Sequence, residues 1–140
     1  MKNKSGHEAL RRYWLLGLWL AGILFPLGRL GNYSAQFRRA FDTAFGAETM
    51  HVVMHFILYM GLVLIVFWVS HAQLTLRFLI VAPALVLLVG LAQELFQAWS
   101  NDHFLLGPLA YDLGVDLTGG FMGLALVAAW EKLKKRKHIA

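Results

Sequence analysis

Cysteine is absent from this chain of 140 residues, and charged residues are few. Without cysteine, disulfide bonds and thiolate chemistry are excluded, and the redox compartment stays open. Charged residues make up 15% of the chain and hydrophobic residues 59%, whereas soluble domains have about 25% and about 45–50% respectively. Together with a mean hydropathy of +0.58, this composition indicates an apolar surface that requires lipid to cover it.

Long apolar runs account for the high hydropathy. A helix needs roughly 20 apolar residues to cross a bilayer core of about 30 Å, and no run alternates polar and apolar residues as a β-barrel strand would. We therefore expect an all-α membrane protein, a single domain over residues 1–140 built as a bundle of four transmembrane helices. These helices are predicted at about residues 13–27, 50–69, 74–99 and 113–130.

The first apolar run follows a basic segment, a pattern also typical of a signal peptide. No clear cleavage site follows the run, and Pro26 with Gly28 is typical of a helix end. We therefore expect an uncleaved first helix.

The segment at residues 33–45 differs from the apolar runs. Aromatic residues recur there at every fourth position, namely Tyr33, Phe37, Phe41 and Phe45. This spacing predicts an amphipathic interfacial helix, lying in the membrane surface within the first outer loop. A loop whose aromatic side chains touch the bundle is the alternative interpretation.

The distribution of positive charge predicts the orientation of the bundle. Four spans place both termini on one side, and all 13 basic residues except Arg29, Arg38 and Arg39 would lie on that side. The positive-inside rule therefore places both termini, with the basic tail at 131–140, in the cytoplasm. Because this tail explains much of the net charge of +5, we expect membrane lipids as partners and no nucleic acid.

Polar residues gather near the outer ends of the predicted spans. A charged carboxylate at a helix centre costs about 2.5–3.5 kcal/mol on insertion scales, so such residues are retained where they face a cavity or a partner. The alternative is that these groups satisfy one another and hold the helices together. Six of these residues form three pairs, and the two members of each pair lie on one helix face. Tyr59 lies one turn deeper than the first pair. The pairs are His51 and His55, Glu94 and Gln97, and Asp112 and Asp116.

Three glycines follow the aspartates. Gly119 and Gly123 have the GxxxG spacing, with Gly120 between them, and small residues at this spacing let a second helix approach closely. We expect these glycines to serve helix packing and to hold the two aspartates against the second and third spans.

These motifs, in this order, resemble the VanZ-like family of small integral membrane proteins. That family typically has a His-Phe-x-x-Tyr stretch, then Glu-x-x-Gln at a helix end, then Asp-x-x-x-Asn/Asp-x-x-Gly. The resemblance covers about residues 51–123. Its motif residues here are His55 and Tyr59, Glu94 and Gln97, and Asp112, Asp116 and Gly119.

Two positions depart from the family pattern. His51 and Val52 stand where the family often has an acidic residue and a Lys. The loop at 98–111 has no basic residue, although the family usually carries an Arg there, a residue suited to binding phosphate or carboxylate.

The resemblance implies a multi-pass protein of the bacterial inner (cytoplasmic) membrane, with a glycopeptide-resistance-like role at the cell envelope, and it names no reaction. We predict that the outward-facing site binds or processes an envelope lipid or a lipid-linked glycan precursor; whether the chain is an enzyme, and with which cofactor, stays open. The candidate catalytic groups are Glu94, Asp112, His55 and Asp116, and the candidate substrate-binding groups are Tyr59, Gln97 and His51.

Other functions stay open. His51 and His55 have a spacing that suits a divalent cation, but Val52 stands where the zinc motif His-Glu-x-x-His has Glu, so we assign no metal. A non-catalytic small subunit or assembly factor of a larger membrane protein complex is the main alternative. A transporter or channel is disfavoured, unless the chain oligomerises, because the inner half lacks polar residues to continue a pathway.

Overall fold

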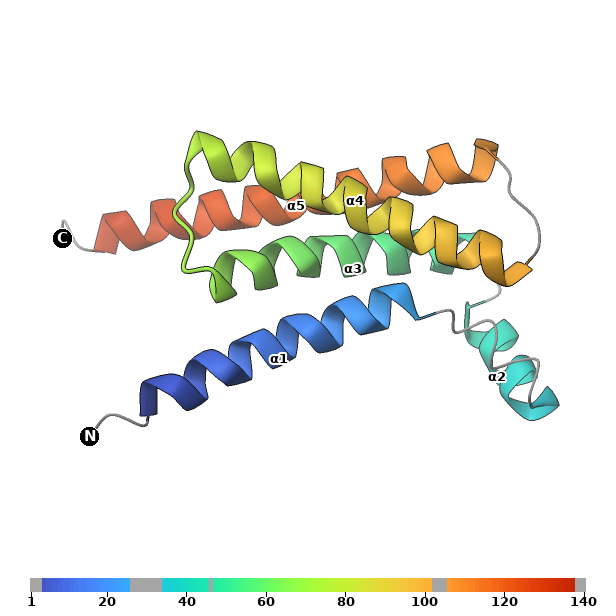
Figure 1. The fold of residues 1–140 in the computed structure, drawn as a ribbon. Coiled ribbons are helices and arrows are strands. Elements are labelled where there is room, and N and C mark those ends of the chain that lie inside the picture. Colours follow the sequence, from blue (N-terminus) through green and yellow to red (C-terminus); the bar gives the residue numbers. More distant parts are fainter. Residues whose placement is uncertain (1–3, 26–33, 46, 102–105, 138–140) are drawn as a thin grey trace.

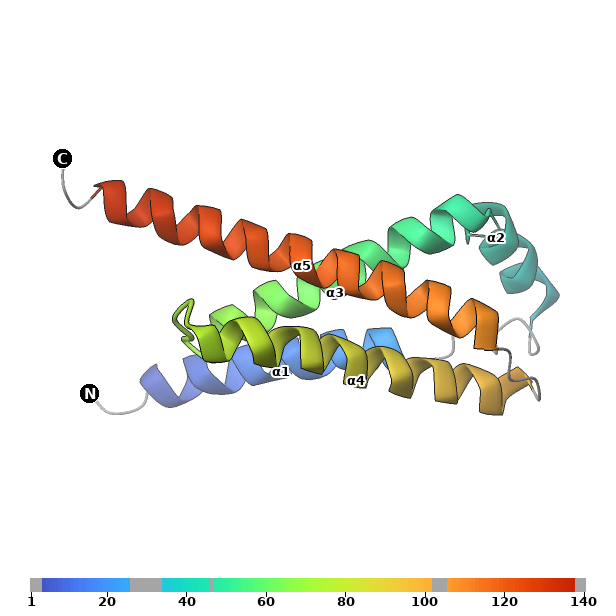
Figure 2. The ribbon, with the colours of Figure 1, turned by 90° about the horizontal axis from the view of Figure 1, so that it is seen from above.

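The chain folds into an elongated bundle of helices. The computed structural model describes residues 4–25, 34–45, 47–101 and 106–137, and every regular element in these ranges is an α-helix. Four long helices lie side by side, and the short helix α2 lies at one end of the bundle (Figures 1 and 2). The helices are α1 (Lys4–Leu24), α2 (Ala35–Phe45), α3 (Glu48–Val69), α4 (Leu76–Asn101) and α5 (Leu106–Lys137).

Three of these helices are long and apolar enough to cross a membrane: α3, α4 and α5. Helix α1 differs because Arg11 and Arg12 interrupt it. Its uncharged part within the described residues runs only from 13 to 24, less than the roughly 20 residues that span a bilayer. The prediction of an all-helical fold is thus confirmed together with three candidate spans, and the fourth span stays a prediction.

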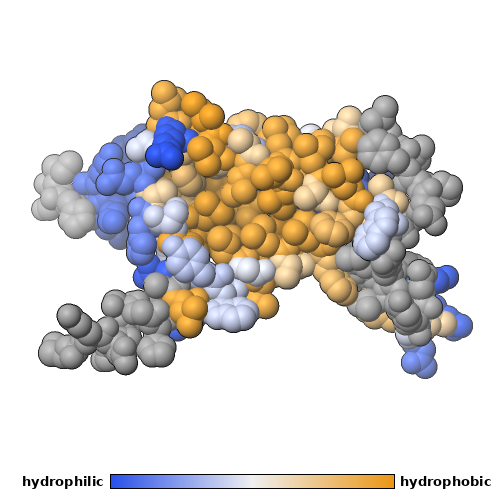
Figure 3. Space-filling model, viewed as in Figure 1, coloured by the Kyte–Doolittle hydropathy of each residue, from blue (hydrophilic) through white to orange (hydrophobic). Residues whose placement is uncertain are grey.

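Apolar side chains cover the middle of the bundle. Figure 3 shows an almost continuous hydrophobic face there, with hydrophilic residues at the end of α5 and on α2 at the opposite end. Leu88 and Ile80 on α4, for example, are 66% and 63% exposed. Exposed apolar patches wider than a few hundred Å² are rare on soluble monomers, so this surface suits lipid.

Helices α3 and α5 form the closest pair. A Cβ atom on Gly119 would overlap the backbone oxygen of Phe56, and one on Gly123 would lie 2.8 Å from the backbone oxygen of Met60. Gly120 instead faces α4, where its Cβ would lie 2.9 Å from Val86. The absence of side chains at these glycines therefore lets α5 approach α3 on one face and α4 on another.

Helix α1 packs against α3 on the other side of the bundle. The indole Nε1 of Trp19 donates a hydrogen bond of 2.9 Å to the backbone oxygen of Leu58. The same indole occupies the space over Gly61, where a Cβ atom would collide with it. Farther along α3, the Arg12 guanidinium contacts His71 and lies 5.0 Å from the Trp68 ring.

The helix ends differ from the predicted ones chiefly in α5. This helix begins at Leu106 and ends at Lys137, whereas the sequence predicts 113–130. Pro108 is tolerated in a first turn because its missing N–H would have no intrahelical partner there, and the lysines of the last turn favour the negative end of the helix dipole. Asp112 therefore lies inside the helix instead of before it.

Smaller differences occur elsewhere. Helix α1 begins at Lys4, earlier than predicted, and α4 runs from Leu76 to Asn101, through Pro83. The segment expected as an interfacial helix is helical as α2, but Tyr33 lies outside the described residues. Its place in a membrane surface stays a prediction.

Candidate functional site

Buried polar side chains gather at one end of the bundle. Helices α3 and α5 both begin at this end, beside α2, and α4 ends there (Figure 1). Among the described residues, the buried polar side chains are His55, Gln93, Asp112 and Asp116. We use the name polar cluster for these four residues and their three neighbours His51, Tyr59 and Glu94.

The most deeply buried pair in the polar cluster joins α3 to α5. His55 Nδ1 lies 2.8 Å from Asp116 Oδ1, and the two side chains are 4% and 1% exposed. An ionised carboxylate only accepts hydrogen bonds, so Nδ1 carries the hydrogen, and in a neutral ring Nε2 is then the acceptor nitrogen. The other oxygen of Asp116, Oδ2, is buried without a hydrogen-bond partner.

A second pair repeats this arrangement one turn nearer the helix starts. His51 Nε2 lies 3.4 Å from Asp112 Oδ2, with side-chain exposures of 45% and 12%. The repeat occurs because α3 and α5 run in the same direction (Figure 1), so that a step of four residues along each helix advances both by about one turn. The polar cluster is therefore accessible at His51 and closed at Asp116.

Tyr59 extends the polar cluster one turn deeper. Its hydroxyl donates a hydrogen bond of 2.7 Å to Gln93 Oε1 on α4, and its ring stacks on His55 with the ring centroids 6.3 Å apart. Gly90, also on α4, faces this region: a Cβ atom there would lie 2.7 Å from Asp116 Oδ2 and 3.5 Å from the Tyr59 hydroxyl. The missing side chain thus lets the Asp116 carboxylate pack closely against the α4 backbone at Gly90.

Helix α4 also contributes Glu94. This side chain interacts electrostatically with Asp112, His55 and Asp116, so we include it in the polar cluster. Its Oε1 atom is buried without a hydrogen-bond partner. Gln97 differs, because among the described residues it makes no hydrogen bond to the polar cluster.

Gln93 is the residue that the sequence interpretation missed. It precedes Gln97 by four residues and therefore lies on the same helix face. A polar amide within the apolar run of α4 was a usable signal, since uncompensated polar groups are rare inside membrane helices. Whether Gln93 or Gln97 meets the polar cluster depends on how far α4 is displaced along α3. The sequence carries no information on this displacement.

The polar cluster is rich in hydrogen-bond acceptors. The ion pairs of Asp112 and Asp116 are both with histidine, and Glu94 adds a third carboxyl group. His51, His55 and Asp112 can each offer one ligand atom to a metal ion, and these three atoms lie within 4.8 Å of one another. The arrangement suits hydroxyl or amine donors and cations better than a bare anion.

Fold and site together define a helical protein with three candidate membrane spans and a buried polar cluster at one end of them. Comparisons of the chain with family models, with curated proteins and with solved structures find no match. The resemblance to the VanZ-like family therefore rests on the motif residues in the sequence, and the catalytic and substrate-binding roles given to the cluster stay predictions.

Proposed function

We propose that this chain is a VanZ-like integral membrane protein whose polar cluster binds the headgroup of a cell-envelope lipid or a lipid-linked glycan precursor. In this proposal α1 is the fourth span, both termini lie in the cytoplasm of a bacterial cell, and α2 lies in the outer membrane surface. The polar cluster then faces the outer leaflet, where such lipids present their headgroups.

One observation carries this proposal. Among the described residues, the buried side-chain oxygens without a hydrogen-bond partner are Glu94 Oε1 and Asp116 Oδ2, and both belong to the polar cluster. Polar residues that only hold helices together satisfy one another, whereas a buried acceptor without a donor costs about 1–3 kcal/mol. Two such acceptors in one place favour a ligand that supplies the donors.

The acidic character of the polar cluster narrows the class of ligand. Sugar hydroxyls and amines donate hydrogen bonds to carboxylates, whereas a bare phosphate would be repelled by the carboxylates of Glu94, Asp112 and Asp116. His51 at the helix start is the exposed part of the polar cluster, so such a headgroup would make its first contact there. We therefore favour a glycan or an amine-bearing headgroup over an exposed phosphate.

Native mass spectrometry of the protein extracted gently from its own membrane tests this function. We compare the wild type with Asp116→Asn and with Glu131→Gln, a matched control on the opposite end of α5. The wild type and the control should retain a lipid adduct that Asp116→Asn loses. Identical adducts in all three proteins, or a chain that leaves only with partner proteins, would contradict the proposal, and the second outcome would favour the small-subunit alternative.

A further inference from the structure

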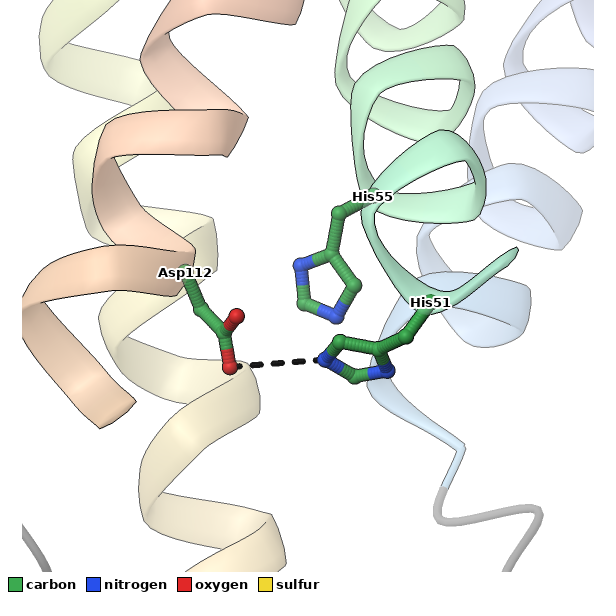
Figure 4. Close-up of side chains that lie close together, drawn as sticks. All are labelled: His51, His55 and Asp112. Carbon is green, nitrogen blue, oxygen red and sulfur yellow. Dashed lines mark hydrogen bonds and ion pairs between the residues drawn. The ribbon is translucent and has the colours of Figure 1, made fainter. Parts of the chain in front are cut away.

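Two histidines and an aspartate converge where α3 and α5 begin. Figure 4 shows His51 and His55 on adjacent turns of α3, with Asp112 facing them from α5. We propose that these three residues bind a divalent transition-metal ion, with zinc as the first candidate, and that Asp116 holds His55 in the orientation for binding. This site does not depend on the proposed lipid ligand.

One of the distances between the ligand atoms already fits a tetrahedral ion. Nitrogen and oxygen ligands lie about 2.0–2.1 Å from zinc, so two ligands in tetrahedral geometry are separated by about 3.3 Å. The distance of 3.4 Å from His51 Nε2 to Asp112 Oδ2 agrees with this value. The three ligand atoms lie within 4.8 Å of one another, so the ligand atoms that are farther apart must move closer together when the ion binds.

Asp116 supplies the independent support. Histidines that bind a metal through one ring nitrogen usually donate the other N–H to a carboxylate, which fixes the ring and its tautomer. His55 does this with a hydrogen bond of 2.8 Å from Nδ1 to a carboxylate that is fully buried. Its Nε2 atom has no hydrogen-bond partner among the described residues, and in Figure 4 it points toward His51.

The alternative is that the polar cluster is held by hydrogen bonds alone. The rings of His51 and His55 lie with their centroids 4.4 Å apart, close enough for one ion to contact both, whereas hydrogen bonds alone leave Nε2 of His55 without a partner among the described residues. Together with Asp112, the two histidines form a set of two nitrogens and one oxygen, of the type that zinc and related ions bind.

Three protein ligands leave one position open. Sites of this kind hold a water molecule or a substrate atom in the fourth position. Because His51 lies at the accessible side of the polar cluster, the open position would face the same headgroup region as the proposed lipid site. The ion would add positive charge there, and it would therefore let an oxygen of an anionic headgroup approach the acids.

Metal binding is tested on the full chain in detergent micelles, stripped with a chelator and dialysed against zinc alone. We expect about one zinc ion per chain, since the site has a single set of ligands. His51→Gln should weaken binding by at least about tenfold, and Asp116→Asn by about 10–100-fold, as expected of a group that orients a ligand. His71→Gln, at a histidine just beyond the far end of α3, is the matched control and should bind as the wild type does.

Two outcomes would overturn the site. One is a wild type that folds but retains no zinc at micromolar concentrations. The other is zinc binding that His51→Gln and Asp112→Asn leave unchanged. Thermal unfolding of each variant shows whether it is folded, and the visible spectrum of bound Co²⁺ reports four-coordinate geometry directly. No lipid takes part in these measurements, so their failure is distinguishable from failure of the lipid-binding function.

Discussion

At the residue scale, Asp116 combines deep burial with incomplete hydrogen bonding. One of its oxygens accepts a hydrogen bond from His55, whereas the other packs against Gly90 and has no hydrogen-bond partner. A buried polar atom without a hydrogen-bond partner lowers the stability of the folded protein. Binding sites commonly retain groups that lower stability because the ligand needs them.

We expect Asp116→Asn to be at least as stable as the wild type. The amide oxygen still accepts the hydrogen bond from His55, and the substitution removes a buried negative charge. Thermal unfolding in detergent, without metal, provides the measurement. Glu131→Gln, which removes an acid at the other end of α5, serves as the control. A lower melting temperature for Asp116→Asn alone would show that the aspartate stabilises the bundle, as in the interpretation of the cluster as helix packing.

The hydroxyl of Tyr59 makes a different prediction. Tyr59→Phe leaves Gln93 Oε1 without the donor that now lies 2.7 Å away, and hydrogen bonds between membrane helices contribute about 0.6 kcal/mol on average and up to about 1.7 kcal/mol. We therefore expect the free energy of unfolding to fall by roughly this amount. Tyr13→Phe, at a tyrosine that is 61% exposed, should leave it unchanged, and an equal effect of both substitutions would contradict the prediction.

At the scale of elements, the pairing of α3 with α5 positions the polar cluster. Both helices start at the same end, so the two partners in each pair lie at the same depth in the bundle: His51 with Asp112, and His55 with Asp116. Gly119 and Gly123 of α5 lie about one and two turns below Asp116 and let the backbones of α3 and α5 approach. The separation of the two helices therefore sets the distance across both pairs.

Substitution at Gly119 tests this arrangement. A Cβ atom there would collide with the backbone oxygen of Phe56, which cannot move as a side chain can, so we expect Gly119→Ala to lower stability by about 1–3 kcal/mol. Gly114→Ala is the matched control, because nothing lies within 4 Å of its Cβ position; it should be neutral or stabilising by up to about 1 kcal/mol. Unfolding measurements on both variants that gave the same result would contradict the close contact.

The sequence predicts these elements better than it predicts their relative positions. Apolar runs identify the cores of α3, α4 and α5, and i,i+4 spacing places His51 with His55 and Asp112 with Asp116. Spacing along one helix carries no information on the offset between two helices. For this reason Gln97 was predicted in the site and Gln93, one turn earlier, was missed.

At the scale of the whole molecule, the polar cluster lies at the opposite end of the bundle from the start of α1 and the end of α5 (Figure 1). Charge follows the same division, since the last turn of α5 contains Lys134, Lys135, Arg136 and Lys137. Under the positive-inside rule, we expect this end to face the cytoplasm.

The absence of cysteine from the sequence makes this orientation simple to test. In intact cells, a membrane-impermeant maleimide should label Gln36→Cys on α2 but not Gln73→Cys in the connection between α3 and α4, both of which are exposed. Leu88→Cys, which is exposed on the apolar middle of α4, should stay unlabelled even after lysis because lipid covers it. Labelling of both glutamine positions from the same side would contradict the proposed topology.

The length of α5 relates the polar cluster to the thickness of the bilayer. At about 1.5 Å per residue, Lys132 and Asp112 are separated by about 30 Å of helix, which equals a typical hydrocarbon thickness. With the lysines held at one interface, Asp112 lies at the other and Asp116 about one turn inside it. A thicker bilayer would draw Asp112 below the interface, and a thinner one would expose it to water. The acyl-chain length of the surrounding lipid would then tune the affinity of this site without any change in the protein.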